Sequence, residues 1–393
     1  MAGRARRVLF VAVLACVPLA ALALVEGTAS LALFAHTLLR DQVAEDSYTE
    51  RDTLLGWISK PNFYNPDFYG PGRSLRSNGQ RFRHDGDLAP QPPTGRLRVV
   101  CSGDSFTLGF GVGDAQTWCA QLAGVDSSLE TVNMGQGGYG IDQAYLWYLR
   151  DGIRLHPDVH IFAFIEPDFA RMRSDRFLGY PKPVLVRDSD GVRAEGVPVP
   201  RPGLGRFMVR LTDATRTLRI YTAFGYLYRK FKHPTNPTDA LQKDSLTWKL
   251  ARATFRELAR RDSAAGAQLT VVFLPTYDDY AGHFSDSYRR WAREDAARHE
   301  FNYVDLIKPL RKTPPDSVDM FFIKQGEVPF AHATGHYTAI GNAWVAAQLR
   351  RLVPALTRRL ATQRPPAMGT SRERVSVIMA RRGRTRSVAL LRN

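Results

Sequence analysis

Short apolar runs alternate with helix-like amphipathic stretches in two parts of the chain. The run Val159–Ile165 is almost wholly apolar, which is typical of a parallel strand covered on both faces. Alternating strands and helices predict one doubly wound domain: a mostly parallel sheet in a three-layer α/β/α arrangement. We expect strands at 97–101, 131–134, 159–165, 269–274 and 303–306, and helices at 115–124, 141–150, 284–299 and 340–353.

Residues 171–262 interrupt this alternation. Val184–Val186 and Val197–Val199 flank an Asp-Ser-Asp-Gly run, which predicts a hairpin. Two basic helical stretches are expected after it, near 206–231 and 239–262. We interpret the whole span as an insertion, a hairpin-plus-helices lid or flank of the main domain and not an independent domain.

An apolar segment opens the chain. Three arginines precede Val8–Val25, a run of 18 uncharged residues. At about 1.5 Å per residue, a helix of this length reaches across the hydrocarbon core of a membrane. The arginines favour a cytoplasmic N-terminus, which leaves the remainder on the extracytoplasmic side. A signal peptide cleaved near Ala21-Leu22-Ala23, giving a secreted protein, remains the alternative.

The chain therefore divides into four expected parts. The first is a signal anchor or transmembrane helix, and a polar approach segment rich in Pro, Gly and Asn follows it. The main domain contains the insertion, and a basic tail without a stable pattern ends the chain. The expected bounds are 1–35, 36–95, 96–355 and 356–393.

The formal charge of +16 is unevenly distributed. Residues 171–262 carry +11 and the chain from Arg351 onward carries +10, so the remainder is acidic. Neither basic region contains a recognition-helix or zinc-finger spacing, so we expect no nucleic-acid partner. A basic surface facing an anionic polymer or an acidic surface fits the charge equally well.

Three cysteines are too few for a disulfide scaffold or a four-cysteine zinc site. Cys101 ends an expected strand and Cys119 lies in the following helix. Because buried cysteines are commonly unpaired, we expect both to be free thiols.

Gly103-Asp104-Ser105 follows the first expected strand. A serine there lies on a strand-to-helix turn at the carboxyl edge of the sheet, where doubly wound folds bind ligands. The amides of the helix start favour an oxyanion. The motif differs from the Gly-x-Ser-x-Gly elbow of α/β hydrolases because residue 107 is threonine.

A glycine-rich run follows the second expected strand. Gly135, Gly137 and Gly140 match Gly-x-Gly-x-x-Gly, but the acidic residue that a dinucleotide site needs about 20 residues later is missing. The run is also in the second strand–helix unit and not the first. We therefore expect no dinucleotide cofactor, and glycines that bring backbone amides close to a ligand.

His332 and His336 form a His-x-x-x-His pair before the last helix. The pair lacks the glutamate of the zinc-protease motif, and Gly335 disfavours a helix there. We expect no metal site.

Taken in order, these pieces resemble the SGNH/GDSL hydrolase family. The similarity covers most of residues 50–170 and 265–350. Its parts are the runs Gly-Asp-Ser-Phe-Thr-Leu-Gly-Phe-Gly-Val and Asn-Met-Gly-Gln-Gly-Gly-Tyr-Gly-Ile-Asp-Gln, then His156-Pro157-Asp158, Leu269–Pro275 and Gly335–Leu349, and in the approach segment Leu55-Gly56-Trp57 and Asn78–Arg83.

The resemblance implies a role for several residues. Ser105 matches the nucleophile that forms an acyl-enzyme, and His336 matches its general base. The backbone amides of Ser105 and Gly138 match two oxyanion donors. No cofactor or metal is implied.

Two positions depart from the family pattern. The third oxyanion donor is an asparagine in a Gly-x-Asn-Asp run, and Pro167 stands in its place. The acid that orients the histidine lies two or three residues before it, where this chain has Thr334 and Ala333. A Ser–His dyad, a backbone carbonyl or a carboxylate from elsewhere, such as Glu327, would each serve instead.

The sequence thus predicts a membrane-tethered, extracytoplasmic serine esterase or O-acyltransferase. Its substrates would be O-acyl esters, in particular acetyl esters, of envelope carbohydrate or lipid. The missing Asn and Asp motivate an alternative, a degenerate member that binds a glycan or lipid headgroup without turnover. A third possibility is an anchored scaffold whose basic tail contacts a partner or nucleic acid.

Overall fold

The structure is a computed structural model, and it describes residues 2–39, 47–124, 126–189, 191–203, 208, 211, 215, 218, 237–283, 285–298 and 300–357. The expected helix near 206–231 lies almost entirely outside the described residues. The expected basic tail does so as well.

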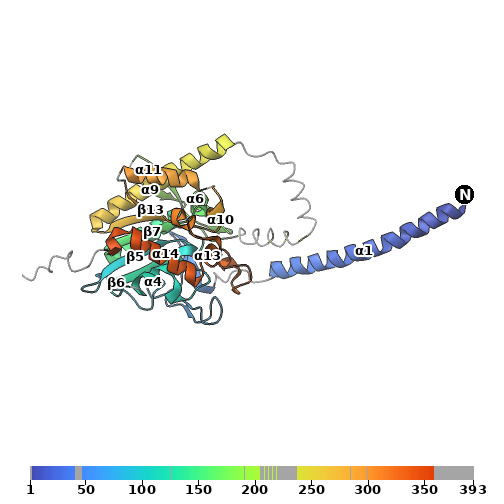
Figure 1. Ribbon diagram of the computed structural model, residues 1–393, viewed down its shortest axis with the longest axis horizontal. Helices are drawn as coiled ribbons and strands as arrows, with labels where there is room; N and C mark the ends of the chain where they lie inside the picture. The colour runs from blue at the N-terminus through green and yellow to red at the C-terminus, as the bar shows by residue number, and fades with distance from the viewer. Residues whose placement is uncertain are drawn as a thin grey trace, which may run out of the picture. The chain divides into compact units, whose positions relative to one another are not determined.

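The five expected strands form one sheet (Figure 1). Every neighbouring pair in it is parallel, in the order β13-β12-β7-β5-β6. The first strand, β5, is internal; the chain runs out to β6 and returns to the other side of β5 with β7, which confirms the doubly wound prediction. The strands are β5 (Leu97–Gly103), β6 (Leu129–Gly135), β7 (Val159–Phe164), β12 (Gln268–Phe273) and β13 (Asn302–Asp305).

Successive side chains of the central strands enter different cores. In β7, Phe162 and Phe164 belong to one buried cluster, while Ile161 and Ala163 belong to the other. This period of two explains why the central strands are continuously apolar. The first cluster includes residues of α5 (Ile141–Arg150), α9 (Pro237–Ala265) and α11 (Asp286–Ala297), and the second those of α4 (Trp118–Gly124) and α14 (Ala339–Leu352).

The other elements of the domain are short. The helices are α3 (Ser105–Leu108), α6 (Pro167–Met172), α10 (Asp278–Ala281), α12 (Ile307–Leu310), α13 (Pro315–Asp319) and α15 (Pro354–Thr357), and 3-10 turns lie at Asp114–Gln116, Gly152–Leu155 and Ala331–Ala333. Short strands pair as β1 (Thr49–Asp52) with β2 (Gly56–Ser59), β3 (Tyr64–Asn65) with β4 (Leu75–Arg76), β8 (Arg176–Phe177) with β9 (Tyr180–Pro181), and β10 (Val184–Arg187) with β11 (Val192–Glu195).

The expected insertion differs from the prediction in two respects. Its hairpin pairs β10 with β11, so Val197–Val199 is not the second strand. Helix α9 is not part of a lid, because Trp248, Phe255 and Leu258 are buried in the main core. These residues recur at helical spacing on one side of α9, and the basic residues that dominated its sequence pattern lie between them.

The approach segment is packed onto the main domain. Trp57 and Phe82 are buried in the same core as α5 and α9. The buried Arg83 guanidinium donates to the carbonyls of Leu108 and Gly109, at 2.6 and 3.0 Å. The segment therefore supports the loop that leaves α3.

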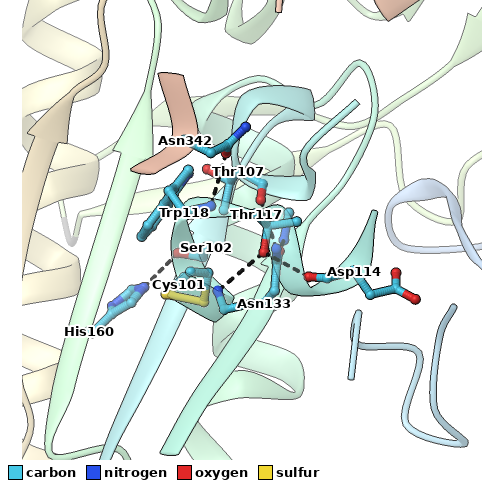
Figure 2. Close-up of a disulfide and its surroundings, with 12 residues drawn as sticks. Cys101, Ser102, Thr107, Asp114, Thr117, Trp118, Asn133, His160 and Asn342 are labelled. Carbon is cyan, nitrogen blue, oxygen red and sulfur yellow. Dashed lines mark hydrogen bonds between the residues drawn. A yellow bond between two sulfur atoms is a disulfide. The ribbon is translucent and has the colours of Figure 1, made fainter. Parts of the chain in front are cut away.

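Cys101 of β5 and Cys119 of α4 form a disulfide, so the prediction of free thiols was wrong (Figure 2). Their Cα atoms are 6.3 Å apart, within the range that a disulfide needs. The sequence places the two cysteines on neighbouring elements, but only the packing of α4 against the sheet determines that separation.

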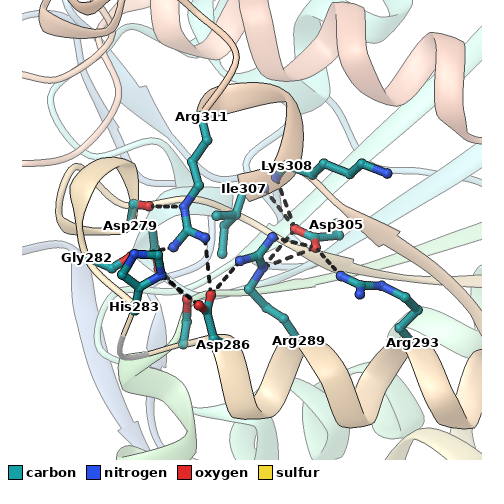
Figure 3. Close-up of polar contacts among 11 residues, drawn as sticks. Asp279, Gly282, His283, Asp286, Arg289, Arg293, Asp305, Ile307, Lys308 and Arg311 are labelled. Carbon is teal, nitrogen blue, oxygen red and sulfur yellow. Dashed lines mark hydrogen bonds and ion pairs between the residues drawn. The ribbon is translucent and has the colours of Figure 1, made fainter.

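Charged residues attach α11 to the far edge of the sheet (Figure 3). Arg289 donates to both carboxylate oxygens of Asp305 at the end of β13, and to Asp286 at 2.7 Å. Arg311 also contacts Asp286, at 3.2 Å. This network fixes the loop before α11, which leaves the carboxyl edge of β12.

Helix α1 (Ala2–Leu39) contains the apolar N-terminal segment. Its stretch Cys16–Ala35 is long and apolar enough to cross a membrane, and a signal sequence would have the same properties. The expected span Val8–Val25 overlaps the first half of that stretch. The helix continues beyond that span, through residues 28–39.

Candidate active site

Ser105 begins α3, directly after β5. Asp104 is the N-cap, and its Oδ1 accepts a hydrogen bond from the amide of Phe106 at 2.9 Å. The short helix packs closely on β6: a Cβ added to Gly135 would lie 2.0 Å from the amide nitrogen of Leu108. The turn therefore holds Ser105 at the carboxyl edge of the sheet, where only 4% of the residue is exposed.

His336 lies just before α14. Its carbonyl accepts from the amide of Ile323 at 2.8 Å, and the following Thr338 caps α14. The imidazole packs against the rings of Phe106 and Phe110, with centroids 4.4 and 5.2 Å away. These aromatic contacts restrict the orientation of the ring.

The two side chains meet across 231 positions of sequence. Nε2 of His336 lies 2.8 Å from Oγ of Ser105, so the predicted approach of these two side chains is confirmed. This is the contact that a histidine base makes with a serine nucleophile. The catalytic roles of the two residues remain predictions.

Nδ1 of His336 is buried, and no side chain of the described residues accepts a hydrogen bond from it; the backbone at Ala333 and Thr334 is the nearby polar group that favours its protonation. Glu327, one of the candidate substitutes, is exposed and accepts from the amide of Lys324 at 2.9 Å instead. Burial and the charge of Arg171 lower the pKa of His336 to about 3, with a smaller opposing effect from the backbone at Ala333 and Thr334. The histidine is neutral at ordinary pH and is a weak base.

The glycine-rich loop after β6 is held by the approach segment. Trp57 donates through Nε1 to the carbonyl of Gly137 at 2.8 Å, and Ser59 donates to Gln136 at 2.7 Å. Gly138 has φ +75°, and a Cβ there would lie 2.4 Å from the ring of Phe177. Backbone conformation and packing both require glycine, and its role as an oxyanion donor remains a prediction.

Pro167 begins α6, at the position of the missing family asparagine. The sequence analysis did not identify a charged cluster on the same short helix: Arg171 contacts Asp168 at 2.6 Å and Asp104 at 3.3 Å. Asp104 directly precedes Ser105, so this cluster adjoins the candidate nucleophile. The sequence did contain a signal for this cluster, because Asp168 and Arg171 are charged residues that follow closely after a strand predicted to be buried.

Glu166 precedes α6 and is half-buried. Burial and the negative charges of Asp279 and Asp244 raise its pKa to about 7. This carboxyl therefore titrates near neutrality beside the carboxyl edge of the sheet.

The His-x-x-x-His pair does not act as a unit. His332 is exposed, whereas His336 faces Ser105. In the described part of the chain, no group of three or more His, Cys, Asp or Glu side chains is arranged to hold a metal ion.

A second Ser–His–Asp arrangement lies in the core. Ser102 is 2.6 Å from Nε2 of His160, and Nδ1 of His160 is 2.8 Å from Asp262. The ring of Tyr148 stacks on His160. Ser102, His160 and Asp262 lie on β5, β7 and α9 and are fully buried, so a substrate in solvent does not reach them and the arrangement serves packing.

The missing acid makes a testable prediction. Because Thr334 is one of the two positions where the family pattern carries the acid, Thr334→Asp should place a carboxylate near Nδ1 of His336. That charge would orient the ring and raise its pKa, so kcat for an aryl acetate should rise about ten- to thousand-fold. The acid limb of kcat/KM should lie below pH 4.5 in the wild type and move upward in the variant, since it reports the pKa of the base.

Thr334→Asn is the matched control, since it has the same size without the charge, and should change neither value. An unchanged acid limb in Thr334→Asp, or a wild-type limb near pH 6.5, would contradict this account of His336.

No protein-family model and no curated protein matches the chain. Among solved structures, it is similar to a member of the lipolytic protein G-D-S-L family from Veillonella parvula (13% identity, TM-score 0.38, covering 67% of this chain and 99% of that one). It is also similar to a catalytic mutant of an acetylxylan esterase from Geobacillus stearothermophilus (12%, 0.36, 67% and 96%) and to a GDSL-like lipase from Bacteroides thetaiotaomicron (12%, 0.34, 68% and 90%).

Proposed function

We propose that the protein is a serine esterase of the SGNH/GDSL type, acting through an acyl-enzyme on Ser105. The observation that carries the proposal is the 2.8 Å contact between Ser105 and His336 at the carboxyl edge of the sheet. Both residues occupy the positions of the family motifs that the sequence resembles.

The reaction follows from this contact. Ser105 Oγ attacks the ester carbonyl and its proton passes to Nε2 of His336, while the carbonyl electrons move to oxygen. Amides of Ser105 and Gly138 would face that oxyanion. When the intermediate collapses, His336 returns the proton to the departing alcohol, and water or a second alcohol then releases the acyl group. Water makes the protein an esterase, and a second alcohol makes it an O-acyltransferase.

We further propose that the domain acts outside the cytoplasm, tethered by α1. The arginines at the chain start and the apolar stretch Cys16–Ala35 support this orientation. The disulfide between Cys101 and Cys119 supports an oxidising compartment. O-acylated envelope carbohydrate or lipid is the substrate class that fits this location. Retention of the uncleaved full-length chain in carbonate-washed membranes tests the tether, and a shortened soluble form would contradict it.

A binding protein without turnover is the second candidate. Two observations favour it: no described side chain pairs with Nδ1 of His336, and proline occupies position 167. Such a protein would use the region around Ser105 and His336 to hold a glycan or lipid headgroup.

Fluorophosphonate labelling of the full-length chain in detergent distinguishes the two candidates. The probe should attach to Ser105 in the wild type and fail to attach in Ser105→Ala. Absence of labelling and of aryl-acetate turnover in folded wild-type protein would leave the binding function.

A further inference from the structure

Arg171 lies one helical turn after Pro167, the residue that replaces the family asparagine. Pro167 is the first residue of α6 and Arg171 follows four positions later, so both are on one face of the helix. Side chains of a helix lean toward its N-terminus, which directs Arg171 back over the turn that Pro167 begins. A long side chain at this position therefore reaches the region that a short asparagine at 167 would occupy.

The guanidinium of Arg171 contacts both segments that carry the expected oxyanion donors. Its Nη1 lies 3.3 Å from the carboxylate of Asp104, the residue before Ser105. The same nitrogen donates to the carbonyl of Tyr139, the residue after Gly138, at 3.3 Å. The positive charge thus lies between the nucleophile turn and the glycine-rich loop.

All hydrogen bonds that Arg171 makes to described residues use Nη1, including the one to Asp168 at 2.6 Å. Within the described chain, Nε and Nη2 retain donors for another acceptor. The ring of Phe177 covers one face of the guanidinium, 5.2 Å from its carbon, and also contacts Gly138. This cover reduces the screening of the charge by water.

Two buried carboxyls adjoin Arg171. Burial raises the pKa of Asp104, and burial together with the charge of Asp104 raises the pKa of Asp168 well above its usual range. Both shifts favour the neutral form of a carboxyl, so the pair opposes a negative charge forming beside it less than two carboxylates with ordinary pKa values would.

We propose that Arg171 supplies the oxyanion stabilisation that this chain lacks at Pro167. The inference rests on the proposed esterase function. When Ser105 attacks, the carbonyl oxygen gains a negative charge between the two loops, and the guanidinium faces that charge. Arg171 transfers no proton; it stabilises the intermediate, and the charge returns to the carbonyl bond when the alcohol leaves.

The test measures aryl-acetate kinetics of the full-length chain in detergent. Arg171→Met should lower kcat about a hundred- to thousand-fold and change KM less than about threefold, because the interaction forms mainly in the transition state. Arg171→Lys keeps a charge and a buried partner for the carboxyls, so it should fold and lose about tenfold. Arg176→Met removes a charge from an exposed position of the neighbouring hairpin and is the matched control.

Pro167→Asn provides a readout that a purely structural role would not move. In the Arg171→Met background it should restore kcat at least about tenfold, because it returns the missing donor. In the wild type, where Arg171 already serves the oxyanion, the gain should be below about threefold. Equal gains in the two backgrounds would overturn the inference.

The outcomes separate this inference from the function on which it rests. Normal labelling of Ser105, with Arg171→Met as active as Arg176→Met, would overturn the role of Arg171 and leave the esterase intact. No labelling and no turnover in the wild type would overturn both.

Discussion

Ser105→Ala is expected to lower kcat for aryl acetates by about 10³- to 10⁵-fold, to the level left by binding and the oxyanion donors. His336→Ala should cost a similar factor, because it removes the base that is 2.8 Å from Oγ. The double variant should be no slower than either single variant, since the two side chains act as one unit. Steady-state kinetics of the three variants measure this.

The second Ser–His–Asp arrangement offers a matched control. Ser102→Ala removes the contact with His160 in the core, 2.6 Å long in the wild type. It should reduce the free energy of unfolding by about 1 kcal/mol, the ordinary contribution of a hydrogen bond, and leave kcat within about threefold. A large loss of kcat in Ser102→Ala with none in Ser105→Ala would contradict the assignment of the site.

Lys182→Met is expected to give the largest loss of stability, about 3–5 kcal/mol of the free energy of unfolding. Lys182 and Asp142 form an ion pair with both side chains fully buried. The ammonium also donates to the carbonyls of Arg171, Ser174 and Pro183, at 3.1, 3.0 and 3.1 Å. Removing the lysine leaves a buried carboxylate and three carbonyls without this donor. Chemical unfolding of the full-length chain in detergent gives the change.

A double variant tests whether the unpaired charge of Asp142 causes the loss of stability. Lys182→Met with Asp142→Leu should recover part of the loss, because no unpaired charge remains in the core. Lys249→Met, at an exposed position of α9, is the control and should stay within about 0.5 kcal/mol of wild type. A loss in Lys182→Met below 1 kcal/mol, or a double variant less stable than the single one, would contradict the role of this pair.

The strands of the sheet could be predicted because the pattern that marks each strand lies within a few consecutive residues. Strands buried on both faces are continuously apolar, as Val159–Ile165 shows, and glycines near strand ends mark turns that need them. The resemblance then indicated Ser105 and His336 as partners, which the structure brings together. Ser105 directly follows β5 and His336 lies just before α14, so a neighbouring element positions each of them.

The errors came from features that depend on packing. Helix α9 was placed in a lid because its charged residues outnumber the apolar stripe of Trp248, Phe255 and Leu258, which packs in the core. The pairing of Cys101 with Cys119 depends on the 6.3 Å separation that the packing of α4 on β5 creates. Neither the packing of α9 nor the separation of the two cysteines can be seen in the pattern of residues along the chain.

The sequence by itself determined the α/β class, the strand positions, the apolar N-terminal helix and the residues of the candidate nucleophile and base. Only the tertiary structure decided that no described side chain pairs with Nδ1 of His336 and that Arg171 lies between Asp104 and Tyr139. It also decided that the contact of Ser102 with His160 is buried while Ser105 lies at the sheet edge. The physical reason is that a motif reflects the backbone conformation of a few consecutive residues. Burial, electrostatic environment and hydrogen bonding depend instead on segments that are far apart in the chain.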